Sequence, residues 1–340
     1  MTAAFVSVGL IGAGTIGKIH ACNIAATPGA RVVAIADPVK SAAERCAEEI
    51  GGAKIFDDYS QMLKTQRLDA VLVCSPGHTH ARIVADVAGF GIHIFCEKPL
   101  GFTLAEIDAA LDSVKQHRVK LQVGYNRRFD RNFQRVREII NTGLLGHLQY
   151  IRITSRDPQV PADDYLKVCG GLFVDTTSHD FDLVRFLTGE EVVEVFARGG
   201  VFLDPRVERA NDLDTAVVFL AFESGFFGVV ENSRRSAHGY DQRVEVWCAK
   251  GSVAVSNRLV DEVLVSDEKG THMSPNKFFF PDRYKESFRE EMAAFIRSVR
   301  DNKEPMVSGI DGKMAIAIAL AAQESLKSGR PVAVSKILAK

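Results

Sequence analysis

Three side chains of the kinds that move protons stand out in the sequence, namely Lys98, Asp175 and His179. Asp175 and His179 are four residues apart, so on a helix they share one face, where a carboxylate can orient an imidazole and stabilise its protonated form. Lys98 follows an apolar strand and precedes a proline that restricts its backbone. An ammonium near such a pair would stabilise negative charge that develops on a reacting oxygen.

A glycine-rich turn lies far upstream of these residues. The run Gly12-Ala13-Gly14-Thr15-Ile16-Gly17 matches G-x-G-x-x-G, follows an apolar strand and opens a helix, and Asp37 lies 20 residues further on. Such glycines permit a tight turn and leave room for a pyrophosphate, which the helix N-terminus attracts. The Asp37 carboxylate would accept hydrogen bonds from ribose hydroxyls and repel a 2′-phosphate, which favours NAD over NADP. The pattern predicts NAD binding by Gly12, Gly14, Thr15, Ile16, Gly17 and Asp37.

Two later strand ends extend the predicted cofactor site. Ligands of open parallel sheets bind outside the carboxyl ends of the strands, and Ser75-Pro76-Gly77-His78 and Glu97-Lys98-Pro99 leave such ends. We therefore expect Ser75, Pro76, His78, Glu97 and Lys98 to contact the cofactor. His78 and His80 have H-x-H spacing, but a solvated or cofactor-facing loop is a better interpretation than a metal site. Considered alone, Lys98 would be interpreted as a surface lysine beside a turn. The glycine-rich fingerprint upstream favours a functional lysine instead.

The segment around Asp175 has two further interpretations. A solvated acidic helix face with an incidental histidine is one, and a divalent metal held by Asp175, His179 and Asp182 is the other. Dehydrogenation with NAD needs only a base for the alcohol proton, and Lys98 already supplies a cation. We therefore rank acid–base chemistry first and predict no metal. Gly170-Gly171 would let this helix start close to a ligand.

The elements that must position these residues change character near Gly124. Before it, short apolar strands alternate with helices, which predicts βαβ units and a doubly wound parallel sheet. After it, we expect an α/β domain with a large, mostly antiparallel sheet. The expected strands there are Val192–Phe202, Asp214–Phe222, Phe226–Glu231, Arg243–Cys248 and Ser252–Val255, and the expected helices are Asn132–Asn141, Phe173–Leu187, Tyr284–Arg300 and Gly309–Lys327. We predict a NAD-binding domain over residues 1–124 and a domain for substrate binding and oligomerisation over residues 125–340.

Composition narrows the class of protein. The 340 residues carry 42 Lys plus Arg against 43 Asp plus Glu, so no overall charge favours nucleic acid or an anionic membrane. No stretch approaches the roughly 18 apolar residues of a membrane span, and no Lys or Arg precedes Lys18 to give the basic start of a signal peptide. The six cysteines are scattered without a C-x-x-C pair, which favours reduced thiols and a cytoplasmic location.

These motifs together resemble the glucose–fructose oxidoreductase and inositol dehydrogenase family of NAD(P)-dependent oxidoreductases. The resemblance covers essentially the whole chain. It rests on Gly12 to Gly17, Glu97-Lys98-Pro99, Gly124 to Asp130, Ser155 to Pro158, Gly170-Gly171, Asp175, Thr177 to Asp182, Asn232 to Arg235 and Gly239 to Arg243. It implies a Rossmann domain followed by an α/β domain whose open sheet face builds dimer or tetramer contacts.

The resemblance also implies an activity and roles for individual residues. The substrate would be a cyclic polyol, myo-inositol, oxidised to the 2-keto inosose, with Lys98, Asp175 and His179 acting together. Asp182 and Tyr240 would touch substrate hydroxyls, and we add Arg127 and Asp157 as candidates, although Arg127 has a cofactor or interdomain alternative and Tyr240 a core alternative. Ser155 and Asp157 stand where some inositol dehydrogenases have His and Asn, which bears on the preferred isomer. The alternatives are a dehydrogenase of another sugar or inositol isomer and a non-catalytic NAD-binding regulator.

Overall fold

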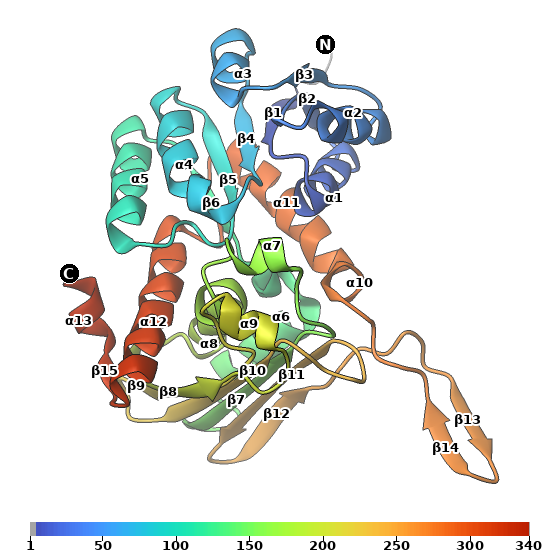
Figure 1. Ribbon diagram of the computed structural model, residues 1–340, viewed down its shortest axis with the longest axis vertical. Coiled ribbons are helices and arrows are strands. Elements are labelled where there is room, and N and C mark those ends of the chain that lie inside the picture. Colours follow the sequence, from blue (N-terminus) through green and yellow to red (C-terminus); the bar gives the residue numbers. More distant parts are fainter. Residues whose placement is uncertain (1–4, 340) are drawn as a thin grey trace. The chain divides into compact units, whose positions relative to one another are not determined.

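The computed structural model describes residues 5–339, and the chain folds into two compact units (Figure 1). The first unit comprises the chain up to Phe129 together with Glu286–Ile316, and the second comprises Asp130–Lys285 together with the chain from Ala317 on. Residues 1–4 and 340, the outer ends of the two predicted domains, lie outside the described residues. The functional division between residues 124 and 125 stays a prediction.

A six-stranded parallel sheet forms the centre of the first unit, which confirms the predicted Rossmann arrangement. Its strands are β1 (Val6–Ile11), β2 (Ala30–Ala36), β3 (Lys54–Phe56), β4 (Ala70–Val73), β5 (His93–Glu97) and β6 (Leu121–Gly124). They lie in the order β3-β2-β1-β4-β5-β6, so the order reverses between β1 and β4. In sheets of this kind, ligands bind outside the carboxyl ends of the strands at that reversal.

Helices connect and cover these strands. They are α1 (Thr15–Ala25), α2 (Lys40–Glu49), α3 (Tyr59–Thr65), α4 (His80–Gly89), α5 (Leu104–His117), α11 (Lys285–Arg300) and the first part of α12 (Gly309–Ser328), with the 3₁₀ turns η1 (Gly77–Thr79) and η2 (Asn126–Phe129). Helix α1 shows why they pack well, because its buried Gly17, His20, Ala21 and Ile24 recur at helical spacing.

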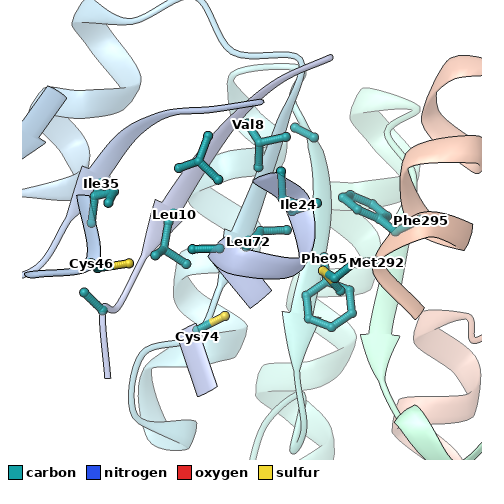
Figure 2. Close-up of a cluster of buried hydrophobic side chains, with 14 of the residues drawn as sticks. Val8, Leu10, Ile24, Ile35, Cys46, Leu72, Cys74, Phe95, Met292 and Phe295 are labelled. Carbon is teal, nitrogen blue, oxygen red and sulfur yellow. The ribbon is translucent and has the colours of Figure 1, made fainter. Parts of the chain in front are cut away.

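The core of the first unit draws on a distant part of the chain. Leu10, Leu72 and Phe95 come from neighbouring strands, and Met292 and Phe295 of α11 are buried in the same cluster (Figure 2). Helix α11 was predicted as a helix, but its sequence pattern did not indicate which core it joins. Burial of its apolar face explains why Glu286–Ile316 groups with the first unit.

The second unit is built on a mixed, mostly antiparallel sheet of seven strands, as predicted. The strands are β7 (Leu148–Arg156), β8 (Val192–Gly200), β9 (Thr215–Phe222), β10 (Phe227–Ser233), β11 (Asp241–Cys248), β12 (Gly251–Val255) and β15 (Val332–Ala333). They lie in the order β12-β11-β7-β10-β9-β8-β15, and only β7 and β10 pair in parallel. Strand β7 was not predicted, because it alternates Arg152 and Thr154 with its apolar residues and therefore lacks the continuous apolar pattern of a buried strand.

The remaining elements of the second unit are mostly short. They are α6 (Arg131–Asn141), α7 (Asp163–Leu166), the π-helical turn η3 (Phe173–Thr177), α8 (Ser178–Thr188), α9 (Pro205–Arg209), α10 (Phe280–Arg283), the end of α12, α13 (Val334–Leu338) and the hairpin β13 (Leu264–Asp267) and β14 (Gly270–Met273). The helix predicted over 173–187 is thus a π turn followed by an α-helix. Among residues 5–339, no helix has the combination of length and apolarity that crossing a bilayer requires.

One face of the second unit's sheet exposes aromatic side chains. Trp247 of β11 lies directly opposite Tyr150 of β7, and Tyr150 contacts Phe227 of β10 with ring centroids 5.3 Å apart. Phe227 in turn stacks on Phe219 of β9 at 5.5 Å. Phe219, Phe227 and Trp247 are 40–47% exposed, so these four rings form an open aromatic row across four strands. Contiguous apolar surface of this kind is typical of interfaces.

Candidate active site

The glycine-rich turn between β1 and α1 has the geometry that its motif demands. Gly12 has a φ of +94°, and a Cβ there would lie 2.6 Å from the backbone of Cys74 and Ser75. A Cβ on Gly17 would lie 2.0 Å from the Gly12 carbonyl oxygen, whereas one on Gly14 would meet nothing within 4 Å. Gly12 and Gly17 are therefore required by the fold, and Gly14 borders open space of the kind that a pyrophosphate needs.

The N-terminus of α1 faces this turn. The helix starts at Thr15, its N-cap residue is Gly14, and no side chain caps its first N–H groups. Uncapped N–H groups and the helix dipole together favour a bound anion. Thr15 and Ile16 are the first two residues of this helix, as predicted from the sequence. The donor set fits the phosphates of a dinucleotide.

Asp37 comes directly after β2 and is held by the backbone. Its Oδ2 accepts a hydrogen bond from the Ala13 N–H at 2.7 Å, and its Oδ1 accepts one from the Val39 N–H at 2.8 Å. These bonds tie the carboxylate to the glycine-rich turn. Each carboxylate oxygen keeps a further lone pair, so Asp37 can still accept hydrogen bonds from ribose hydroxyls.

The loop after β4 divides its two histidines between different environments. His78 is exposed, whereas His80 is buried with Nδ1 2.8 Å from the Pro99 carbonyl oxygen and Nε2 2.7 Å from that of Ser75. Burial, partly opposed by these carbonyl contacts, lowers the pKa of His80. Because both ring nitrogens face carbonyl oxygens, His80 braces the loops after β4 and β5 and offers no nitrogen to a metal.

Lys98 follows β5, and the side chain of Glu97 supports its backbone. Glu97 Oε2 accepts the Lys98 N–H at 3.1 Å, and Glu97 Oε1 lies 2.6 Å from Nε2 of His20 on α1. Gly124 leaves room for this carboxylate, because a Cβ there would lie 2.9 Å from Glu97 Oε2. Glu97 therefore connects the turn that carries Lys98 to the helix that follows the glycine-rich turn, instead of pointing into solvent.

A second acidic side chain approaches the buried His20–Glu97 pair. Glu291 of α11 joins His20 and Glu97 in a buried group, in which one ring nitrogen or carboxylate oxygen from each side chain lies within 4.8 Å of the others. The imidazole of His20 also packs edge-on against Phe95 and Phe288, with ring centroids 4.9 and 5.6 Å away. Sequence reasoning missed His20 and Glu291, since neither has a motif and they lie far apart in the chain.

In the second unit, Asp175 lies within the π-helical turn η3 and His179 lies one turn further on, in α8. Asp175 is buried and His179 is half-buried. The Asp175 Oδ1 accepts a hydrogen bond from the Tyr165 hydroxyl at 2.7 Å, and its Oδ2 lies 3.3 Å from Arg234 Nη1. Sequence reasoning missed Tyr165 and included Arg234 only in the stretch from Asn232 to Arg235 that carries the family resemblance, without giving it a role.

The other face of this helical segment is bonded to the sheet. The Ser155 hydroxyl of β7 lies 2.5 Å from Asp180 Oδ1, and Asn232 Nδ2 of β10 donates to Asp180 Oδ2 at 2.8 Å. The Thr177 hydroxyl donates to Asn232 Oδ1 at 2.7 Å. These buried bonds fix the rotation of the helix that carries His179. Ser155 is thus a structural partner of Asp180.

The other predicted substrate residues lie in both units. Asp157 directly follows β7, Tyr240 directly precedes β11 and Arg234 directly follows β10. Arg156, the last residue of β7, is paired with both Ser233 of β10 and Asp241 of β11, so Asp157, Tyr240 and Arg234 lie at the same end of the sheet. Tyr240 is 8% exposed and packs edge-on against Phe279 and Tyr284. Asp182 is fully buried in α8, and Arg127 is buried in η2 of the first unit. Direct contact of these residues with a substrate stays a prediction.

The fold and the glycine-rich turn define a dinucleotide-binding oxidoreductase with a second α/β unit. Residues 6–125 match the model described as "Oxidoreductase family, NAD-binding Rossmann fold", and residues 133–254 match the "GFO/IDH/MocA C-terminal domain". The chain belongs to this GFO/IDH/MocA family, and its cofactor is NAD.

Relatives and solved structures agree with this assignment. The chain is 43% identical to "Myo-inositol 2-dehydrogenase" of Thermotoga maritima over 97% of this chain and 99% of the relative. It also matches two structures from Lactobacillus casei. A scyllo-inositol dehydrogenase with bound NAD(H) and scyllo-inositol aligns with a TM-score of 0.91 at 29% identity, over 97% and 99% of the two chains. A myo-inositol dehydrogenase in complex with NAD(H) and myo-inositol aligns with a TM-score of 0.87 at 26% identity, over 97% and 96%.

Proposed function

We propose that this protein is an inositol 2-dehydrogenase, which oxidises a secondary alcohol of myo-inositol to the 2-keto inosose with NAD. The observation that carries this proposal is that Asp175 and His179 lie on one helical segment, and that Asp175 pairs with Arg234 at the end of the sheet where Asp157 and Tyr240 also lie. Polar side chains around an acid–base pair suit a polyol, which offers many hydroxyls. The inositol dehydrogenases among its relatives support the same assignment.

The reaction needs a proton acceptor and a stabiliser of negative charge. When bound, NAD supplies the hydride acceptor. His179 takes the hydroxyl proton as general base, and the Asp175 carboxylate orients the imidazole and stabilises its protonated form. Lys98 donates a hydrogen bond to the same oxygen and stabilises the negative charge that develops there. In the reverse direction, His179 returns the proton to the carbonyl oxygen.

The cofactor-binding set that supports this chemistry comprises Gly12, Gly14, Thr15, Ile16, Gly17, Asp37, Ser75, Pro76, His78, Glu97 and Lys98. The open space beside Gly14 and the uncapped start of α1 suit the pyrophosphate. Asp37 suits an unphosphorylated ribose, because a carboxylate repels a 2′-phosphate. The contacts of Glu97 suggest a narrower role for this residue, namely support of the Lys98 backbone.

The test is a substrate panel with the purified protein. Mixed with NAD, myo-inositol should produce absorbance at the NADH band, and NADP should support a much lower rate. Faster turnover of scyllo-inositol or of an aldose would identify the protein as a dehydrogenase of that inositol isomer or sugar instead. If no polyol or sugar gave turnover while NAD still bound, the non-catalytic regulator would be the better assignment.

We also propose that the protein forms dimers or tetramers through the open aromatic row of Tyr150, Phe219, Phe227 and Trp247. The exposed rings span four neighbouring strands, and burying them against a second copy would remove apolar surface from water. We further propose a cytoplasmic location, which the scattered cysteines favour, and a role in inositol catabolism, which the resemblance to inositol dehydrogenases implies.

A further inference from the structure

We propose that Arg234, Asp212 and Tyr165 form a clamp that keeps Asp175 ionised and correctly placed, and thereby sets the proton affinity of His179. We call these three residues the Asp175 clamp. The inference rests on the proposed function, in which Asp175 and His179 are the acid–base pair. None of the three touches the reacting atoms in this scheme, so they are positioning residues.

Arg234 bridges two carboxylates deep within the second unit. Its side chain is fully buried; Nη1 lies 3.3 Å from Asp175 Oδ2, and Nη2 lies 2.8 Å from Asp212 Oδ2. Its Nε donates to the Leu213 carbonyl oxygen at 3.3 Å. The planar guanidinium can serve three acceptors in fixed directions, which a lysine ammonium cannot do. The identity of this residue therefore matters as much as its charge.

The charge balance shows why the arginine is needed. Asp175 and Asp212 have side chains that are 10% and 6% exposed, and two buried carboxylates near one another do not both stay ionised without a cation. Burial alone would lower the pKa of Arg234, but Asp175 and Asp212 outweigh it and raise that pKa. The guanidinium thus stays charged and balances the charge of the two carboxylates.

Tyr165 completes the surroundings of Asp175 from α7. Tyr165 is 47% exposed, and its hydroxyl donates a partly buried hydrogen bond to Asp175 Oδ1. Burial and the adjacent carboxylate raise the pKa of Tyr165, so it remains a hydrogen-bond donor. The titratable and charged groups that face Asp175 include Tyr165 from α7, Arg234 directly after β10 and the Cys169 thiol from the intervening loop.

Asp212 also fixes the backbone of the segment that carries Asp175. Its Oδ1 accepts the Leu172 N–H at 2.8 Å, just before the π-helical turn begins. Gly171 has a φ of +84°, and a Cβ there would lie 3.0 Å from the same oxygen. One carboxylate thus anchors both Arg234 and the start of the turn. The clamp controls where Asp175 lies as well as its charge.

The experiment is a pH profile of kcat/KM for Arg234→Met beside the wild type and Asp175→Asn. Without the guanidinium, the pKa of Asp175 should rise, so the variant should lose about tenfold or more of its rate near neutral pH. The rate should recover toward the wild-type value at higher pH, as Asp175 ionises. Asp175→Asn should stay slow at every pH, and Arg234→Lys should restore part of the rate near neutral pH. Arg185→Met, which breaks a bidentate pair with Glu191 further along α8, is the matched control.

The double variant Arg234→Met/Asp175→Asn provides the second readout. If Arg234 acts through Asp175, the double variant should be no slower than Asp175→Asn alone. A rate loss that is independent of pH, or that adds fully to that of Asp175→Asn, would assign Arg234 a merely structural role and overturn the proposal. If Arg234→Met does not fold, Tyr165→Phe, which removes only a hydroxyl, should show the same pH-dependent loss at smaller size. Absence of turnover in the wild type would instead contradict the proposed function.

Discussion

Partners outside its own helical segment fix the charge of Asp175. Tyr165 donates to one of its oxygens and Arg234 pairs with the other. A carboxylate held in this way can stabilise an imidazolium repeatedly without being protonated itself. The chemistry proposed for His179 therefore depends on groups that the D-x-x-x-H spacing does not include.

The replacement His179→Ala tests the general base. It should lower kcat by roughly 10²-fold or more, because no other side chain is proposed to take the hydroxyl proton. NAD binding should be unchanged, since the glycine-rich turn is in the other unit. NADH absorbance measures kcat, and calorimetry measures the affinity for NAD. A variant with wild-type kcat would remove His179 from the mechanism.

At the scale of elements, the turn between β1 and α1 separates the requirements of folding from those of binding. Gly12 and Gly17 lie against backbone, whereas Gly14 borders open space. The three glycines look equivalent in the motif, but only the first and third are required for packing. The fold and the cofactor thus constrain different positions of the same six residues.

Gly14→Ala and Gly17→Ala should consequently behave differently. Gly14→Ala should keep the melting temperature of the wild type but weaken NAD binding, since its methyl group would enter the pyrophosphate space. Gly17→Ala should weaken NAD binding and also cost roughly 1–3 kcal/mol of stability through the clash with the Gly12 carbonyl. Thermal melts without cofactor, paired with NAD titrations, distinguish the two. Equal loss of stability in both variants would contradict this division.

Strand β5 contributes a pH dependence of stability. Burial and the nearby Lys120 charge lower the pKa of His93, although Asp69 opposes them, and His93 Nδ1 accepts the Lys120 N–H at 3.1 Å. The unfolded chain, with a His pKa of about 6.5, then binds the proton more readily than the folded chain. The stability that His93 contributes is present above that pH and is lost as the pH falls.

His93→Asn keeps an acceptor near the Nδ1 position but cannot be protonated. Its melting temperature should therefore fall less than that of the wild type between about pH 7.5 and pH 5.5. Replacement of the exposed His147 by Asn is the matched control and should follow the wild type. Identical pH dependence in His93→Asn and the wild type would show that His93 does not contribute.

At the scale of the whole molecule, the aromatic row on the second unit's sheet predicts association. Phe227→Arg places a charge within the row and should reduce the mass measured by light scattering to that of a smaller assembly. Phe90→Arg alters a similarly exposed phenylalanine in the first unit and should leave the mass unchanged. A wild type that is monomeric at micromolar concentration would refute the oligomer proposal.

Particular residues show what could be predicted from the sequence and what could not. The alternation of strands and helices predicted the first sheet, because parallel strands are buried on both faces and leave a strong apolar pattern. Strand β7 was missed since its polar residues interrupt that pattern, and no local signal indicated that α11 packs in the first unit's core. The motifs predicted Asp175 and His179. They could not reveal Arg234, Asp212 or Tyr165, whose contacts join segments that are distant in sequence.

The most direct test of the central claim is a crystal structure of the protein with NAD and myo-inositol bound. We predict that one carbinol oxygen lies within hydrogen-bonding distance, about 2.6–3.2 Å, of both a His179 ring nitrogen and Lys98 Nζ, with its carbon facing the nicotinamide. A complex in which the two side chains contact different hydroxyls, or in which neither contacts the inositol, would contradict the proposed mechanism.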